Sequence, residues 1–406
     1  MAELFRPMVD WELRTLIAQL AEKHTTIEII GAGSKRSIGR PVEASALLST
    51  VGLKGISLYE PNELVMSARA GTPLSQIEKE LASRGQMLSF EPLEYGALLD
   101  SSEGLQTIGG IFATNNSGAR RLAVGAARDH LIGLSGVNGR AEYFKSGGRV
   151  MKNVTGYDVA RGLVGSWGTL AVFTELTFKV FPLPDDTVTL IYLGLEENLA
   201  LELMGLALAT PYEVSGAVHL CAAHAARLNV LKFNNGDTSF TALRIENFMK
   251  SVQYRKNKLA EHLAPYGSPL ELDSESSLPF WAQLRKLAQL KSSNSLIWRL
   301  STLPNKAAEL VSVLRQHMDL NVTYDWSGGL VWLEVPSNED GYVADIRRSL
   351  SIFGGHATLI RADESLRKRI DVFQPQSSNL EKLTRGLKKA FDPHGLLNPG
   401  RMYRTL

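Results

Sequence analysis

The chain has 406 residues, enough for two or three ordinary domains, and 44% of them are hydrophobic, enough to fill a core in each. Lys and Arg total 44 against 42 Asp and Glu, and this formal net charge of +2 without any block of like charges disfavours a nucleic-acid partner. The single cysteine, Cys221, excludes an internal disulfide and any zinc site or iron–sulfur cluster built from this chain's own thiolates, and it fits a reducing, cytoplasmic compartment.

The N-terminal residues 1–20 combine acidic residues with helical periodicity, whereas a secretory signal has a basic start and an unbroken apolar run. No stretch of the sequence approaches the roughly 20 apolar residues that a membrane-spanning helix needs. We therefore expect membrane contact only indirectly, through a partner at the inner face of the membrane.

Helices and strands alternate irregularly in the first part of the chain. The pattern predicts a helix capped by Asp10 whose buried face holds Leu13, Leu16, Ile17 and Leu20. A buried strand follows in residues 25–30. Two strands and a helix are expected in residues 55–86, with the helix starting at Thr72-Pro73 and capped by Gly85.

The dipeptide Asn138-Gly139 lies between two strand-like runs and predicts a hairpin, because both residues tolerate the positive φ angles of a tight turn. Residues 172–180 then alternate in the manner of a strand. Beyond Pro184 the composition shifts to helical patterns and short strands, which places a second domain in residues 184–375. The last segment, 376–406, begins with a possible capping box from Ser378 to Glu381.

Three glycine-rich loops in the first domain are the main chemical signal. The first, Gly31 to Gly39 (GAGSKRSIG), follows a strand, and its backbone N–H groups could form an anion-binding concavity suited to a diphosphate. Its spacing fits neither the dinucleotide fingerprint nor the Walker pattern, so a purely structural turn is equally compatible. Lys35 and Arg36 could neutralise phosphate charge or simply face solvent.

The second loop, Thr107 to Gly118, joins paired glycines to an Asn-Asn-Ser-Gly turn, which lets a flat ligand approach the backbone or forms a tight turn between core elements. The third contains Gly156, Gly162, Gly165 and Gly168. Three such loops together favour a long cofactor with a pyrophosphate, a ribityl chain and an aromatic ring.

The sequence resembles the vanillyl-alcohol oxidase and p-cresol methylhydroxylase type of FAD-binding proteins, and within that family the FAD-binding subunits of bacterial glycolate oxidase. The motifs that carry the resemblance are the three loops, residues 64–81, residues 147–170 (GGRVMKNVTGYDVARGLVGSWGTL), residues 354–362 (GGHATLIRA) and residues 391–403 (FDPHGLLNPGRMY). It implies an α+β fold: a two-subdomain FAD-binding domain in residues 1–183, an α+β cap domain with an antiparallel sheet in residues 184–375, and a C-terminal segment, 376–406, returning to the FAD domain.

The same resemblance implies a set of cofactor-binding residues. The pyrophosphate would be held by Gly31, Ala32, Gly33, Ser34 and Lys35. The flavin side would be lined by Thr107, Gly109, Gly110, Asn115, Ser117 and Gly118. Gly168, Thr169 and Phe173 would serve the adenine end, and Asn398 of the terminal NPG motif would lie near the isoalloxazine ring.

The chain departs from related 2-hydroxy-acid dehydrogenases in lacking their histidine- and acid-rich motif for metal and substrate, so we predict no metal site and name no catalytic residue. His219 and His224 lack the neighbouring carboxylates of a persuasive metal site. For His356 a core packing position is the simpler expectation. Neither of the first two glycine loops holds the His or Cys that anchors covalent flavin, so FAD is expected to be non-covalent.

These features favour an FAD-binding subunit of a multi-subunit glycolate dehydrogenase that oxidises a small 2-hydroxy acid. Its partners would be a homologous FAD-binding catalytic subunit and an iron–sulfur subunit. Two alternatives stay open: a self-sufficient flavoenzyme acting on another alcohol or hydroxy acid, and a non-catalytic assembly subunit of the same complex.

Overall fold

The computed structural model describes residues 3–101, 104–149, 156–228, 238–291 and 294–405, and its chain divides into two compact units. Residues 150–155, part of the motif at 147–170, lie outside the described residues. Unit 1 comprises residues 1–117, 125–183 and 375–406, and unit 2 comprises residues 118–124 and 184–374. Unit 2 thus includes a heptapeptide, Gly118–Val124, that no feature of the sequence pattern distinguishes from its surroundings.

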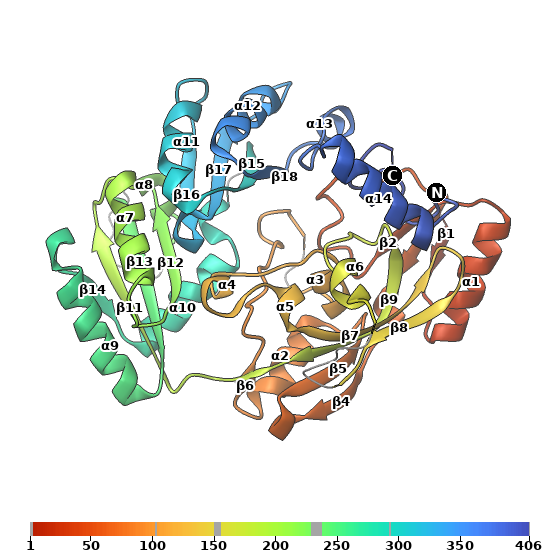
Figure 1. The fold of residues 1–406 in the computed structure, drawn as a ribbon, viewed down its shortest axis with the longest axis horizontal. Coiled ribbons are helices and arrows are strands. Elements are labelled where there is room, and N and C mark those ends of the chain that lie inside the picture. The colour runs from red at the N-terminus through yellow and green to blue at the C-terminus, as the bar shows by residue number, and fades with distance from the viewer. Residues whose placement is uncertain (1–2, 102–103, 150–155, 229–237, 292–293, 406) are drawn as a thin grey trace. The chain divides into compact units, whose positions relative to one another are not determined.

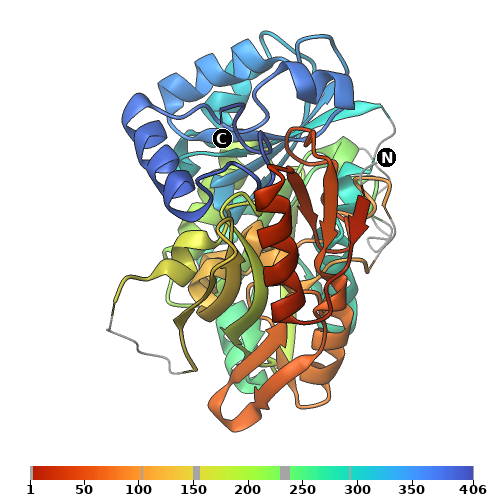
Figure 2. The ribbon, with the colours of Figure 1, turned by 90° about the vertical axis from the view of Figure 1, so that its right-hand side faces the viewer.

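A small parallel sheet forms the first part of unit 1. Its strands follow the order β1-β3-β2, with β1 at Glu3–Phe5, β2 at Ile27–Ile30 and β3 at Ala46–Ser49. Helix α1 (Asp10–Glu22) lies beside this sheet (Figure 2) and buries Leu13, Ile17 and Leu20 against it, as its periodicity predicted. The predicted cap was wrong, because Val9 is the N-cap and the Asp10 carboxylate pairs instead with Arg69.

An antiparallel five-stranded sheet forms the second part of unit 1, so the predicted two-subdomain α+β architecture is confirmed. Its order is β4-β5-β9-β7-β8, built from β4 (Ile56–Glu60), β5 (Val65–Arg69), β7 (Leu131–Asn138), β8 (Tyr143–Gly147) and β9 (Ala171–Lys179). The central strand β9 is buried along nearly its whole length on both faces. The predicted hairpin joins β7 and β8, although its turn is longer than the two residues that the Asn-Gly signal suggested, since Val137 pairs with Tyr143.

Short elements complete unit 1. They are α2 (Leu74–Ala82), β6 (Gln86–Met87), α3 (Ile108–Ala113), α5 (Ala127–His130), α6 (Val159–Leu163), β10 (Phe181–Pro182) and α14 (Ser378–Phe391). Helix α2 follows Pro73 and ends at Ala82, and Gly85 adopts a φ of 63° beyond its C-cap. Helix α14 has Ser377 as N-cap without a side-chain hydrogen bond, so the predicted capping box from Ser378 does not form.

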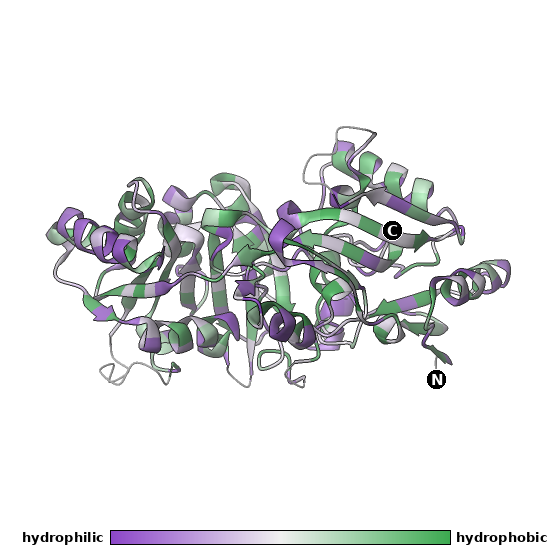
Figure 3. Cartoon of the chain, turned by 90° about the horizontal axis from the view of Figure 1, so that it is seen from below, coloured by the Kyte–Doolittle hydropathy of each residue, from purple (hydrophilic) through white to green (hydrophobic). Residues whose placement is uncertain are grey.

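Unit 2 contains an eight-stranded antiparallel sheet, in agreement with the predicted fold (Figure 1). The strand order is β14-β11-β13-β12-β16-β17-β15-β18. The strands are β11 (Asp186–Leu193), β12 (Val214–Leu220), β13 (Phe240–Asn247), β14 (Leu270–Leu272), β15 (Ser295–Ser301), β16 (Asn321–Asp325), β17 (Leu330–Pro336) and β18 (His356–Arg361). Residues of the strands are predominantly hydrophobic (Figure 3), as expected of a buried sheet.

The helices of unit 2 are α4 (Arg121–Val124), α7 (Glu197–Leu208), α8 (Ala222–Ala225), α9 (Met249–His262), α10 (Ser274–Arg285), α11 (Ala307–Leu314), α12 (Val343–Phe353) and α13 (Glu364–Arg369). Arg120, just before α4, forms a bidentate ion pair with Glu246 of β13, which fastens the inserted heptapeptide to the sheet. His219 is buried, and its Nδ1 is hydrogen-bonded to Thr241 Oγ1. His224 is also buried, and its two ring nitrogens are hydrogen-bonded to Thr323 Oγ1 and to the Glu334 carboxylate. His356 is exposed at the start of β18, so its predicted core position was wrong.

Candidate cofactor site

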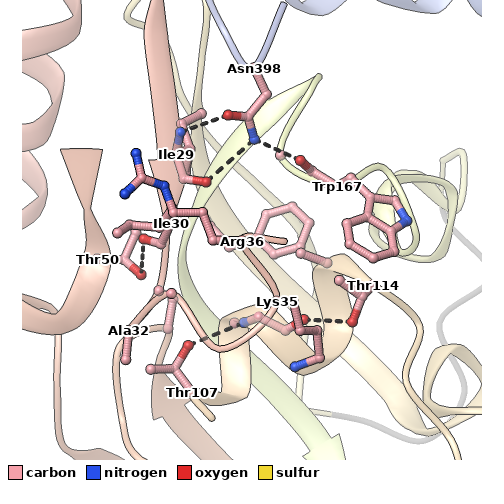
Figure 4. A pocket seen from close by; sticks show the side chains of 18 of the residues that line it. Ile29, Ile30, Ala32, Lys35, Arg36, Thr50, Thr107, Thr114, Trp167 and Asn398 are labelled. Carbon is pink, nitrogen blue, oxygen red and sulfur yellow. Dashed lines mark hydrogen bonds between the residues drawn. The ribbon is translucent and has the colours of Figure 1, made fainter. Parts of the chain in front are cut away.

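One pocket in unit 1 gathers segments that lie far apart in the sequence. Its empty space amounts to about 730 Å³, including the part open to solvent. It is lined by Ile29, Ile30, Gly31, Ala32, Gly33, Ser34, Lys35, Arg36, Thr50, Ala70, Thr107, Gly109, Gly110, Ala113, Thr114, Trp167, Gly168, Ala171, Phe173, Asn398 and Arg401. Figure 4 shows the side chains of Asn398 and Trp167 on one side and those of Lys35 and Thr107 on the other.

The loop after β2 presents backbone N–H groups to this pocket. Within the described residues, no group accepts a hydrogen bond from the N–H of Ala32, Gly33, Ser34 or Lys35. Gly33 has a φ of 86°, the left-handed conformation that lets successive N–H groups converge on one anion. A row of unsatisfied donors against a cavity is the arrangement that a diphosphate requires, so the residues present fit that part of FAD.

Two glycines permit the close approach of the loops. A Cβ on Gly31 would lie 2.3 Å from Thr107 Oγ1, and a Cβ on Gly109 would lie 2.8 Å from the Ala70 carbonyl oxygen. Thr107 is also the N-cap of α3, where its Oγ1 accepts a hydrogen bond from Gly110 N at 3.3 Å. The first two glycine loops are therefore packed directly against each other.

Lys35 is a buried cation without a carboxylate partner in the part of the chain that the structure describes. Its Nζ donates to Gln106 Oε1 at 2.7 Å, and Gln106 is held in turn by Leu93 O and by Asn116. Burial lowers the pKa of Lys35 to about 7. An ammonium group whose charge is not locally neutralised favours an anionic ligand in the adjoining loop.

Arg36 is placed differently from Lys35. Its guanidinium forms a bidentate pair with the Glu28 carboxylate, at 2.8 and 2.5 Å, so the charge of Arg36 is paired with an acidic residue of β2.

Asn398 fixes the far wall of the pocket. Its Oδ1 accepts from Ile29 N at 2.7 Å, and its Nδ2 donates to Trp167 O at 2.7 Å (Figure 4). Gly168 has a φ of 71°, and a Cβ there would lie 2.7 Å from Asn398 Nδ2. The terminal NPG motif therefore joins the end of β2 to the third glycine loop.

Four of the predicted residues are not part of the lining. Asn115 Oδ1 accepts from Arg128 N, Ser117 Oγ accepts from Ala127 N, and Thr169 Oγ1 donates to Ser166 O. Gly118 belongs to unit 2, where its carbonyl accepts from Trp326 Nε1. Their described contacts stabilise the loops themselves.

The sequence interpretation did not single out several lining residues, notably Thr50, Thr114, Trp167 and Arg401. Arg401 is buried and its Nη2 donates to Lys35 O at 2.8 Å, so it supports the first loop from behind. It lies three residues after Asn398 in the same terminal motif, and this proximity was the signal that could have found it. The described residues that line the pocket include no His and no Cys.

No group of three or more His, Cys, Asp or Glu residues among those described is arranged to hold a metal ion. Within the same residues, no helix is both long and apolar enough to cross a membrane.

Comparison with known proteins gives consistent matches. Residues 3–147 match the family model described as FAD binding domain. The chain is 35% identical over 395 residues to glycolate oxidase subunit GlcE of Escherichia coli, covering 96% of each chain. It is 30% identical to glycolate oxidase subunit GlcD of Bacillus subtilis, over 46% of this chain and 38% of that protein. A structure of p-cresol methylhydroxylase with substrate bound shares the fold, with a TM-score of 0.74 and 15% identity, covering 98% of this chain and 88% of that one.

Proposed function

Because the chain belongs to the family of the glycolate oxidase subunit GlcE, we propose that it is the FAD-binding subunit of a multi-subunit glycolate dehydrogenase. The chain is an FAD-dependent oxidoreductase of the hydroxy-acid-oxidising class. In the proposed complex glycolate is oxidised to glyoxylate, and the electrons pass to an iron–sulfur partner subunit.

The observation that carries this proposal is the row of unsatisfied N–H groups from Ala32 to Lys35 beside the pocket. We assign the diphosphate of FAD to residues 31–35 and the flavin side to the α3 loop. The adenine end is assigned to Gly168 and Phe173, and Asn398, which lies against Gly168, is assigned to the same end of the cofactor. FAD, when bound, supplies the hydride acceptor for oxidation of the hydroxyl-bearing carbon.

The chain's own residues bind and orient the cofactor more clearly than they move protons. Among the described lining residues there is no carboxylate and no imidazole to take the hydroxyl proton. Lys35, the one lining amine, already donates to Gln106. This favours dependence on a homologous catalytic subunit, and the single cysteine requires that any iron–sulfur cluster reside on another chain.

Helix α14 presents a surface that fits such a subunit contact. Lys388 of this helix is buried, and its Nζ donates to Thr169 O, Leu397 O and the Asp392 carboxylate. Three leucines of the helix are instead exposed, with exposed fractions of 48, 68 and 50% for Leu380, Leu383 and Leu387. An exposed leucine stripe is typical of a protein interface, and we assign it to another subunit of the complex.

The test is a visible absorption spectrum of the purified chain, followed by acid precipitation and identification of the released flavin. Release of FAD with the oxidised-flavin bands supports the proposed non-covalent site. Anaerobic glycolate is then added to the chain alone and to the reconstituted complex. Flavin reduction only in the complex supports the subunit role, whereas fast reduction by the chain alone indicates a self-sufficient enzyme. No FAD in either preparation overturns the proposal.

A further inference from the structure

A buried lysine of the C-terminal helix joins two segments that lie far apart in the sequence. Lys388 of α14 donates from Nζ to Thr169 O at 2.7 Å, to Leu397 O at 2.9 Å and to Asp392 Oδ2 at 2.8 Å. An ammonium group has three N–H donors, so these contacts use its whole hydrogen-bonding capacity. Thr169 belongs to the third glycine loop and Leu397 to the terminal motif, and one side chain therefore holds the loop and the motif together.

Both carbonyl groups directly adjoin residues that line the pocket. Gly168 precedes Thr169, Asn398 follows Leu397, and Gly168 and Asn398 both belong to the lining. These two lining residues approach each other closely, because a Cβ on Gly168 would lie 2.7 Å from Asn398 Nδ2. The contacts of Lys388 Nζ thus fix the spacing of the two peptide groups next to this wall.

Asp392 keeps the ammonium group in one place. Its carboxylate is buried, with Oδ1 accepting from Leu396 N at 3.1 Å and Oδ2 accepting from Leu397 N at 2.8 Å. A Cβ on Gly139, in the hairpin that follows β7, would lie 2.2 Å from Asp392 Oδ1, so the carboxylate packs directly against the backbone. A buried carboxylate that is hydrogen-bonded to backbone and paired with a cation has a fixed position, and it fixes its partner.

Lys388 supports one end of the pocket and leaves the other end to different residues. It is not among the lining residues, so it acts through Thr169 and Leu397. The first glycine loop, assigned to the diphosphate, is instead supported by Arg401, whose Nη2 donates to Lys35 O. Loss of the Lys388 side chain should therefore disturb the Gly168 wall more than the first loop.

We propose that Lys388 is a positioning residue for the adenine end of FAD, because it holds the third glycine loop against the terminal NPG motif. The proposal rests on the assignment of Gly168 and Asn398 to that end of the cofactor in the function proposed above. Through this wall, a side chain outside the lining contributes to the preference of the site for FAD over FMN, which has no adenosine.

Binding of FAD, ADP and FMN to the chain freed of its flavin tests this role without measuring turnover. FAD and ADP contain the adenine end, whereas FMN does not. Lys388→Met keeps a long, unbranched side chain of similar helix propensity but removes the three hydrogen bonds of Nζ. We expect it to weaken binding of FAD and ADP by at least about tenfold and binding of FMN by no more than about twofold.

Lys389→Met is the matched control, since it makes the same substitution at the next residue, which is exposed. It should leave all three affinities unchanged. Flavin fluorescence measures FAD and FMN binding, isothermal titration measures ADP binding, and circular dichroism verifies that each variant is folded. If the unpaired Asp392 carboxylate prevents folding of Lys388→Met, Lys388→Arg replaces it. Arginine keeps the charge but presents its donors in one plane, so the same selective loss is expected to a smaller extent.

The outcomes separate this role from the proposed function. Unchanged FAD and ADP affinity in the folded Lys388 variant, or an equal loss of FMN affinity, overturns the positioning role and leaves the FAD site in place. If the wild-type chain binds no FAD, both the proposed function and this inference are wrong. A selective loss of FAD and ADP affinity, in a chain whose complex does not oxidise glycolate, supports the role of Lys388 and overturns the proposed substrate.

Discussion

Arg120 and Glu246 form a bidentate ion pair within unit 2, with N–O distances of 2.9 and 2.6 Å. The pair is largely buried, and Arg244 contacts the same carboxylate at 3.3 Å. Burial by itself would raise the pKa of Glu246, but the charges of Arg244 and Arg120 and the hydrogen bonds from Arg120 and Ser215 lower it to about 2. Glu246 is thus the electrostatic centre that joins the heptapeptide to the sheet.

We predict that Glu246→Gln destabilises the protein by about 3–5 kcal/mol at pH 7, because it leaves two buried guanidinium groups without their anion. A carboxyl group whose folded pKa is lowered from 4.5 to about 2 contributes its stability above pH 4.5 and loses it as the pH falls toward 2. Urea unfolding of both proteins between pH 7 and pH 2.5 measures this. The difference in unfolding free energy should shrink over the acid range, and a constant difference would contradict the assignment.

Gly31→Ala should lower the affinity for FAD by at least about tenfold, because its Cβ would lie 2.3 Å from Thr107 Oγ1 and would push the first loop away from α3. The matched control is Gly386→Ala in α14, where the added Cβ meets nothing within 4 Å. That change should leave FAD binding intact and stabilise the helix by about 0.5–1 kcal/mol. FAD titration followed by flavin fluorescence, together with thermal unfolding, distinguishes the two. If Gly31→Ala binds FAD as tightly as the wild type does, the first loop is not part of the FAD site.

Local patterns predicted the elements whose contacts lie near in sequence. The hairpin at Asn138 and the buried face of α1 depend on neighbouring residues, and both formed. Features that depend on distant partners were missed. The Asp10 carboxylate pairs with Arg69 instead of capping α1, and the ion pair between Arg120 and Glu246 holds the heptapeptide in unit 2. His356 was expected in the core because no local signal indicates that it starts an edge strand beside Arg299.

The candidate site was likewise predicted only in part. The first glycine loop could be identified because glycines, which leave the backbone accessible, can be read directly from the sequence. By contrast, the position of Arg401 behind Lys35 depends on the C-terminal segment returning to the first loop, which periodicity does not indicate.

Lys35 should make FAD binding depend on pH. In the apo protein its lowered pKa, about 7, means that stability increases as the pH rises from 7 toward 10.5, since the unfolded state binds the proton more tightly. A diphosphate in the adjoining loop favours the charged amine, so affinity for FAD should fall on the order of tenfold between pH 6.5 and pH 8.5. Dissociation constants for wild type and Lys35→Met over this range provide the test. If the variant keeps the full pH dependence, another group is responsible.

Asn398→Ala should reduce both stability and FAD content. It removes the hydrogen bonds to Ile29 and Trp167, at about 0.5–1.5 kcal/mol each, and places alanine at a φ of 42°. Asn398→Gly removes the same bonds but accepts the backbone angle, so it should be more stable than the alanine variant by about 1 kcal/mol. Thermal unfolding of the two apo proteins and their flavin content are the measurements. If both variants match wild type in flavin content, Asn398 does not support the pocket.

The leucine stripe of α14 should be needed for assembly and dispensable for folding. Leu383, 68% exposed, has little apolar contact to lose within this chain, so Leu383→Glu should change the unfolding free energy by no more than about 0.5 kcal/mol and leave FAD content unchanged. In a subunit interface the same change buries an unpaired carboxylate, which should weaken association on the order of a hundredfold. Co-purification with the partner subunits and sedimentation analysis report this effect. Arg385→Gln on the other face of the helix is the control, and an intact complex with Leu383→Glu would place the subunit contact elsewhere on the chain.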